Sequence, residues 1–357
     1  MNDAATKSGF LKRHLRLLVA SGFLALGLIW IMKRGALPLL PPEGALAHTN
    51  WWLVALSALA LFLSIILRFA RYTFLISSVA HVPMRRILTI SSIALGLVTF
   101  LPFRLGEFAR PAMLREKGRL SGWAVTGTVG AERIIDGVLF GLMLLAGLAL
   151  AEPHEPLPDH IGSLPVPAKL VPQAALFATV VFVGAFVVMA IFYWWRTTAR
   201  RITEWSLGLV SKRLAGVLAD AVERLSDGLR FLTDPRKTVP FLAVSVVASL
   251  LHIWSMQLLA DAVGLGQVNF AEATVLTGVL GLAFALPNAP GFFGTIQLAL
   301  YAGLAVYVTP SQVVTEGAAL VFLFYVSYLS QVVLITLGGV LFESRGVTDA
   351  PLASPTK

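Results

Sequence analysis

The chain has 357 residues, of which 57% are hydrophobic and only 13% are charged, and its mean hydropathy is +0.80. Because soluble domains carry about 25% charged residues, this composition excludes a cytosolic enzyme, a secreted domain and a disordered chain, and favours a polytopic helical membrane protein. The sequence has no cysteine, which excludes disulfides, thiolate metal sites and cysteine nucleophiles. The net charge of +9 fits basic cytoplasmic loops and anionic lipid headgroups better than nucleic acid.

Full membrane spans are expected where about 20 apolar residues follow one another, the length that crosses roughly 30 Å of hydrocarbon. In chain order, these spans are predicted at about 15–32, 51–75, 123–150, 174–195, 239–260 and 314–341. Between and beyond them lie a tail at 1–14, an acidic, proline-rich loop at 151–173, a basic linker at 196–238 and a tail at 342–357. The linker repeats apolar residues at three- and four-residue intervals between basic ones, which predicts amphipathic helices on the inner leaflet.

Two further apolar segments, 87–112 and 272–308, are interrupted by proline and glycine. The charges of the loops decide whether these segments cross the membrane. Nine Lys and Arg residues lie in 196–238 but only Lys169 in 151–173, so the former is expected inside and the latter outside. The loop at 151–173 can be outside and the linker at 196–238 inside only if the segment 87–112 enters the membrane from the cytoplasm and returns to it. By the same count of crossings, the segment 272–308 is a hairpin that enters from outside and returns there. We therefore predict two re-entrant hairpins and cytoplasmic termini.

The order of span, broken segment and span occurs twice, in a first membrane half at 15–150 and in a second at 239–341. Because the two hairpins enter from opposite sides, the halves form an inverted repeat. Paired broken helices of this kind are a recurring plan of secondary transporters, whose sites lie at the breaks. The predicted fold class is an all-α polytopic membrane protein with about six full transmembrane helices plus two re-entrant helical hairpins in an inverted repeat.

Two clusters of charged residues fall inside predicted membrane segments, where a charge costs roughly 2.5–3.5 kcal/mol on insertion scales. The first cluster lies at the tip of the first hairpin and consists of Arg104, Glu107 and Arg110. The second lies in the span at 123–150 and consists of Glu132, Arg133 and Asp136. Three- and four-residue spacing lets the acids and arginines of each cluster pair on one helical face, and such pairing can be purely structural. The same arginines can offer a guanidinium fork to a phosphate.

Other polar residues in the spans have simpler expected roles. Arg68 and Arg71 close the span at 51–75 and are expected to extend to the membrane interface. His252 is expected to be a hydrogen-bonding partner. No H-E-x-x-H, P-loop or G-x-S-x-G motif is present and the six histidines are scattered, so we expect no catalytic residue, no cofactor and no metal site.

Three motifs resemble those of the lysylphosphatidylglycerol synthase transmembrane (flippase-like) family. They are Pro102 to Glu107 followed by Arg110, then Glu132-Arg133-x-x-Asp136, and then Pro287 with Pro290-Gly291-x-x-Gly294. The resemblance covers about 15–341 and implies the flippase-like part of that family without its soluble aminoacyltransferase domain. One departure is Gln297, which stands where the family has a Glu after the glycines of the second tip. The candidate substrate-binding residues are Arg104, Glu107, Arg110, Glu132, Arg133, Asp136, Pro287, Gly291, Gly294 and Gln297.

The residues and the resemblance together predict a non-enzymatic protein of the bacterial plasma membrane that translocates a polar lipid between leaflets. Its expected partners are membrane lipids with an anionic or phosphate-bearing headgroup, and no nucleic acid; a homo-oligomer stays open. One alternative is a membrane enzyme that acts on a polyprenyl-phosphate or phospholipid with Glu107 or Asp136 as general base. The other is a scaffold subunit without transport, in which the charged residues only lock the hairpins.

Overall fold

The computed structural model describes residues 22–23, 25–34, 36–114, 122–153, 159–160, 163, 170–195, 230–285 and 289–345. The predictions for both tails, for much of the span at 15–32, for most of the loop at 151–173, for most of the linker at 196–238 and for Pro287 therefore lie outside the described residues. Within the described ranges every regular element is a helix, which confirms the predicted all-α fold.

Five helices among the described residues are long and apolar enough to cross a membrane. They are α2 (Trp51–Ile76), α5 (Gly122–Leu150), α6 (Leu170–Trp194), α9 (Pro235–Ala262) and α13 (Glu316–Glu343), with the short α12 (Pro310–Val314) before α13 and the 3-10 turn η2 (Arg230–Thr233) before α9. Their ends lie within four residues of the five predicted spans that the structure describes. Hydropathy therefore located these helices.

The chain folds back on itself at both predicted breaks. The first hairpin runs from α3 (Met84–Phe100) through the 3-10 helix η1 (Pro102–Phe108) into α4 (Ala109–Leu114), which packs against α3. The second runs from α10 (Phe270–Ala283) through η3 (Pro290–Phe292) into α11 (Thr295–Leu304), which packs against α10. Entry of each hairpin into the membrane from its predicted side stays a prediction.

Both hairpin tips depend on unusual backbone conformations. A Cβ atom on Gly106 would lie only 2.1 Å from the backbone nitrogen of Val98, so glycine is required for η1 to lie against α3. Gly291 and Gly294 adopt φ angles of 71° and 80° at the second tip, the left-handed region that glycine occupies without strain. Arg104 also has a positive φ, 58°, which is strained for a residue with a side chain. The first tip therefore holds an arginine in a conformation that only its surroundings can maintain.

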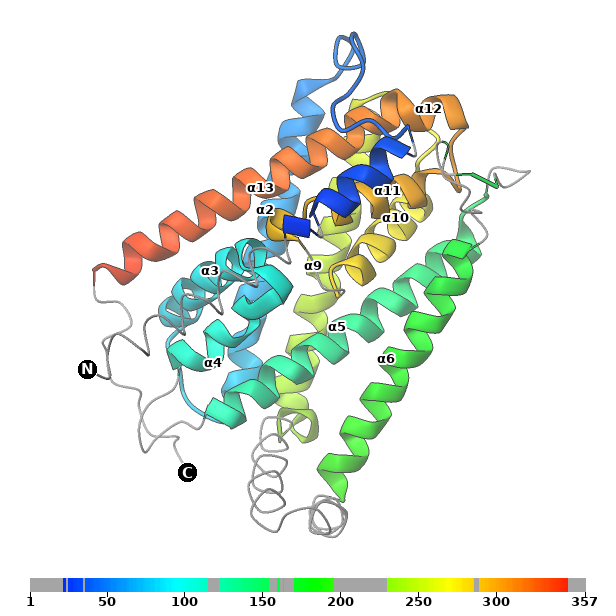
Figure 1. Cartoon of the computed structure of the whole chain (residues 1–357). Helices are drawn as coiled ribbons and strands as arrows, with labels where there is room; N and C mark the ends of the chain where they lie inside the picture. The colour runs from blue at the N-terminus through cyan, green and yellow to red at the C-terminus, as the bar shows by residue number, and fades with distance from the viewer. Residues whose placement is uncertain are drawn as a thin grey trace.

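The helices of the two predicted halves pack across one another. Helices α2 and α9 run antiparallel, and Ser57 and Ser255 each donate a hydrogen bond to the backbone carbonyl of the other, at 2.7 and 2.9 Å. Helix α3 of the first hairpin packs on α13, and α10 of the second packs on α5 (Figure 1). Each hairpin thus contacts the last helix of the other half. Such reciprocal contacts are expected when two units are related by a twofold axis.

Glycines allow this close packing at corresponding positions. A Cβ atom on Gly96 of α3 would lie 2.5 Å from the side chain of Thr336, and one on Gly281 of α10 would lie 2.7 Å from Phe140. Each glycine lies at the same distance in sequence from the proline of the following Leu-Pro break, Gly96 before Pro102 and Gly281 before Pro287. Small residues at helix contacts are typical of membrane proteins, where close packing rather than a hydrophobic driving force holds helices together.

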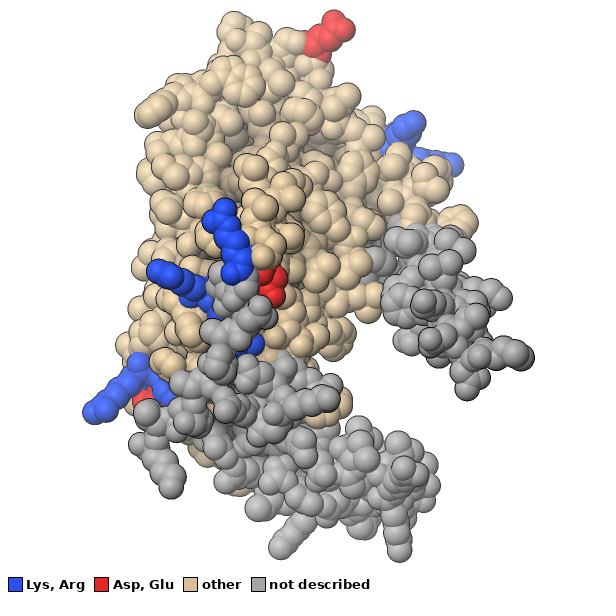
Figure 2. Space-filling view, turned by 90° about the vertical axis from the view of Figure 1, so that its left-hand side faces the viewer, with Lys and Arg blue, Asp and Glu red and all other residues tan. Residues whose placement is uncertain are grey.

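The surface confirms a multi-pass membrane protein. Figure 2 shows one face on which the described residues are largely uncharged, with few Lys, Arg, Asp or Glu side chains among them. On α6, the large side chains of Phe177 and Val180 are 72% and 60% exposed. A helix with so much apolar surface requires lipid rather than water around it.

Candidate functional site

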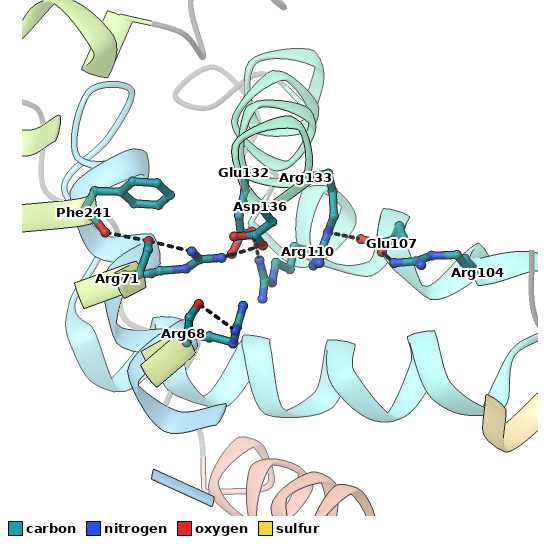
Figure 3. A network of polar contacts seen from close by, with 11 residues as sticks. Arg68, Arg71, Arg104, Glu107, Arg110, Glu132, Arg133, Asp136 and Phe241 are labelled. Atoms are coloured by element: carbon teal, nitrogen blue, oxygen red, sulfur yellow. Dashed lines mark hydrogen bonds and ion pairs between the residues drawn. The ribbon is translucent and has the colours of Figure 1, made fainter. Parts of the chain in front are cut away.

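A cavity of about 470 Å³ lies between the two halves of the molecule. All six charged residues predicted from the sequence line it: Arg104, Glu107, Arg110, Glu132, Arg133 and Asp136. Arg68 and Arg71 of α2 and His252 of α9 line the same cavity. Figure 3 shows the arginines and acids of this lining converging from α2, α5 and the first hairpin. The two clusters of the sequence thus form one site.

Arg71 is at the centre of the buried part of this site. Its Nη2 donates to Glu132 Oε1 at 3.2 Å and to Asp136 Oδ2 at 2.6 Å, while its Nη1 donates to Ser245 Oγ at 2.7 Å. The residue is only 1% exposed, and its guanidinium lies 5.0 Å from the centre of the Phe241 ring. The expectation that Arg71 extends to the membrane interface is therefore wrong, because α9 packs along α2 and covers it.

Arg110 of α4 connects the first hairpin to α5. It donates to Glu132 Oε2 at 2.5 Å, so one carboxylate accepts from both Arg71 and Arg110. The Arg110 guanidinium also lies 4.8 Å from the ring of Tyr72, whose hydroxyl bonds with Thr128 at 2.8 Å. Spacing along the chain suggested a pair between Arg110 and Glu107, but the partner across the helix interface is Glu132.

Glu107 organises the outer part of the site. It pairs with Arg104 in the same 3-10 helix, where side chains three residues apart lie one above the other. Its other oxygen, Oε2, lies 3.3 Å from the Nε of Arg133. The Arg133 side chain is 43% exposed and forms its ion pair with Glu107, not with Asp136 on its own helix. Glu107 therefore holds two arginines from different elements at the edge of the cavity.

The site has more hydrogen-bond donors than acceptors. Arg68 donates to Ser249 Oγ at 3.3 Å and lies 5.0 Å from the Phe140 ring, but forms no ion pair with any described carboxylate. The Nε of Arg71 and the Nη1 of Arg104 are buried without an acceptor in the described part of the chain, and the buried Nε2 of His252 has no hydrogen-bond partner there. An anion with several oxygens is the ligand that such donors suit.

The second half contributes a cluster of aromatic residues to the lining of the cavity. Phe284 lies 4.9 Å from Phe292 and 5.6 Å from Tyr328, measured between ring centres, and these three residues line the cavity. Phe324 stacks between Tyr328 and His252, at 6.3 and 6.1 Å. The cavity is therefore amphipathic: the first half contributes its arginines and carboxylates, the charged wall, and the second half contributes this aromatic cluster, the aromatic wall.

The three predicted residues of the second tip that the structure describes, Gly291, Gly294 and Gln297, are not part of the cavity lining. Gln297 is 4% exposed, and its Oε1 accepts a hydrogen bond from the backbone N–H of Gly294 at 2.8 Å, which caps the start of α11. A Cβ atom on Gly294 would lie 2.5 Å from the Cβ of Leu28, so this glycine lets the helical segment at 25–34 pack on the tip. Gly291 is buried, and it is Phe292 beside it that lines the cavity.

The sequence analysis did not include Arg68, Arg71 and His252 in the site. A pattern in the sequence does indicate that these residues belong to it. Polar residues recur every seven positions along α2, at Ser57, Ser64 and Arg71, and at four- and three-residue steps along α9, at Ser245, Ser249 and His252. Two long apolar helices that each carry one polar stripe are expected to bury those stripes against each other.

Among the described residues, no three His, Asp or Glu side chains come close enough together to hold a metal ion.

Comparison with known families gives one match. The model of the family described as lysylphosphatidylglycerol synthase TM region matches residues 15–334. The match includes both hairpins and every charged residue of the cavity. No curated protein and no solved structure matches the chain.

Proposed function

This chain belongs to the lysylphosphatidylglycerol synthase transmembrane family, and from that premise we propose that it moves a phosphate-bearing lipid between the leaflets of a bacterial plasma membrane. The family links the chain to the metabolism or movement of lipids. The observation that carries the finer proposal is the amphipathic cavity between the two halves. A lipid has the same two-part chemistry, with a polar headgroup and apolar chains.

In this proposal the charged wall binds the headgroup and the aromatic wall faces the chains. Arg68 and Arg133 are free to contact a phosphate, because Arg68 has no described acidic partner and Arg133 has one contact at 3.3 Å. Guanidinium groups suit phosphate through paired hydrogen bonds. Glu107 positions Arg133, and Glu132 positions Arg71 and Arg110. Hydrogen bonds from these arginines thus replace the hydrogen bonds to water that the headgroup loses when it enters the cavity.

The packing of the halves supports translocation rather than binding alone. Each hairpin contacts the last helix of the other half, and α2 and α9 cross between them. Repeats related in this way can rock about a central site, so that it opens first to one side and then to the other.

The test is leaflet exchange of fluorescent phospholipids in liposomes that contain the purified protein, measured by dithionite quenching. Arg133→Leu should reduce exchange to the protein-free rate, because it removes a headgroup contact. Arg236→Leu is the matched control, since Arg236 is exposed at the start of α9 outside the cavity, and it should exchange as the wild type does.

Two results would contradict this proposal. Normal exchange by a well-folded Arg133→Leu protein would remove Arg133 from the mechanism. No exchange by the wild type with any headgroup would overturn translocation, and a new covalent product in the lipid extract would favour the enzyme alternative.

A scaffold role is favoured by a separate observation. Each of the three carboxylates in the cavity is held in an ion pair, and together these pairs join α2, η1, α4 and α5. Reversing every charge of the Glu107 pairs, as Glu107→Arg with Arg104→Glu and Arg133→Glu, distinguishes the roles. A scaffold should regain full function when the pair is restored. A translocator should regain stability but not exchange, because the guanidinium group no longer stands where the headgroup passes.

A further inference from the structure

The charged wall of the cavity carries more positive than negative charge. Its arginines are Arg68, Arg71, Arg104, Arg110 and Arg133, and its acids are Glu107, Glu132 and Asp136. With histidine neutral, five positive charges against three negative charges leave a surplus of two. This count covers the described residues that line the cavity.

The surplus belongs to particular groups. All three carboxylates already accept from guanidinium groups, so each is counted as ionised and none is left to neutralise a further arginine. Arg68 has only a serine hydroxyl and an aromatic ring as partners in the described part of the chain. Arg71 and Arg104 each bury one N–H group without an acceptor there. The cavity therefore lacks about two negative charges and several acceptor oxygens.

We propose that this surplus selects the headgroup by charge, so that the cavity takes a terminal phosphate with two negative charges and rejects zwitterionic and cationic headgroups. The inference rests on the proposed function and names the substrate class of the same site. A terminal phosphate carries about −1.5 to −2 charges at pH 7 and presents three strong acceptor oxygens. A phosphodiester such as phosphatidylglycerol brings one charge and leaves one arginine uncompensated.

The same phosphate group occurs on lipids and on water-soluble esters. The aromatic wall favours a lipid, because Phe284, Phe292 and Tyr328 offer three ring faces and, among them, a single polar group, the Tyr328 hydroxyl. A water-soluble phosphate would leave that wall without a partner.

The first experiment compares headgroups on the wild type, in liposomes with acyl-labelled phosphatidic acid, phosphatidylglycerol, phosphatidylcholine or lysylphosphatidylglycerol. Phosphatidic acid should exchange at least about tenfold faster than phosphatidylglycerol, the effect of one charge-assisted contact. The other two lipids should exchange at the protein-free rate. This series needs no variant and so does not depend on the folding of one.

The second experiment changes the surplus by one charge. Arg68→Gln should lower the rate ratio of phosphatidic acid to phosphatidylglycerol about tenfold, whereas Arg68→Lys should keep most of that ratio because it keeps the charge. Arg236→Gln, outside the cavity, should leave the ratio unchanged. An unchanged ratio in a folded Arg68→Gln protein would contradict the assignment of the surplus to Arg68.

The outcomes separate this inference from the proposed function. Equal exchange of all four lipids would overturn charge selection and leave translocation intact, whereas no exchange of any lipid would overturn translocation itself. Thermal unfolding of the protein in detergent then identifies the source of the phosphate. Stabilisation by phosphatidic acid but not by glycerol 3-phosphate supports a lipid ligand, and equal stabilisation by both would overturn it.

Discussion

Arg71 and Arg133 line the same cavity but differ in how strongly the fold depends on them. Arg71 is 1% exposed and holds two carboxylates and a serine hydroxyl, while the Arg133 side chain is 43% exposed and has one ion pair. Removing one partner of a buried ion pair costs about 3–5 kcal/mol, since a charge is left uncompensated. An exposed pair contributes about 0–1 kcal/mol. At this scale Arg71 is a structural residue, and Arg133 is available to a ligand.

Arg71→Leu should therefore lower the free energy of unfolding by about 3–5 kcal/mol. Arg133→Leu should lower it by less than about 1 kcal/mol. Thermal unfolding of the purified protein in detergent measures both. Adding Asp136→Asn to Arg71→Leu should recover part of the loss, because Asp136 is paired with Arg71 alone among the described residues, whereas Glu132 must stay ionised for Arg110. Similar losses for the two single variants would contradict the distinction.

At the scale of elements, helix contacts depend on which face of a helix carries glycine. Gly338 and Gly339 are neighbours in α13, but only one faces α3. A Cβ atom on Gly339 would lie 2.7 Å from the Cβ of Ser92 and 3.1 Å from the carbonyl oxygen of Thr89, while one on Gly338 would meet nothing within 4 Å. The contact between α13 and the first hairpin therefore tolerates no side chain at Gly339.

Gly339→Val should destabilise the protein by about 1–3 kcal/mol, the usual effect of overpacking. Gly338→Val changes the helix propensity by the same amount without touching α3, so it should leave the unfolding temperature near that of the wild type. The difference between their unfolding temperatures measures the contact itself. Equal temperatures would mean that α3 and α13 are not packed as described.

At the scale of the whole molecule, the two ends of the helix bundle differ in charge. At one end, the Lys237 side chain donates to the backbone carbonyl of Ser77 at 3.3 Å. Two further basic residues belong to the same segments, since Arg236 is next to Lys237 and Arg85 follows Ser77 at the start of α3. At the other end, the N–H of Asn50 donates to the carbonyl of Ala262 at 2.9 Å. Four acidic residues lie in the segments at this second end, Glu43, Asp261, Glu272 and Glu316, and they outnumber the basic pair Lys33 and Arg34, where the Arg34 carbonyl accepts from Ser163. From the positive-inside rule we predict that the basic end faces the cytoplasm.

Membrane-impermeant maleimide tests this orientation without background, because the chain has no cysteine. Ser311→Cys, exposed at the start of α12, should react in intact cells. His81→Cys, exposed between α2 and α3, should react only after the membrane is permeabilised. The reverse result would invert the assignment of the two ends.

Much of this protein was determined by the sequence alone, because the determining signals are local. Hydropathy located the five described spanning helices within four residues. Proline and glycine predicted the two breaks, since they interrupt a helix wherever it packs. Six of the eight charged residues that line the cavity were selected because a charge inside a membrane segment is costly in any fold.

Only the tertiary structure decided which of these residues act together. Spacing along one helix suggested Arg110 with Glu107 and Arg133 with Asp136, but contacts between helices pair Arg110 with Glu132 and Arg133 with Glu107. The cause is physical: a buried charge takes its partner from whichever helix packs over it, and that helix is set by glycine contacts and hairpin geometry far away in the chain. For the same reason the packing of α9 on α2 brings Arg71 into the site, and the cavity gains an aromatic wall that no local pattern predicted.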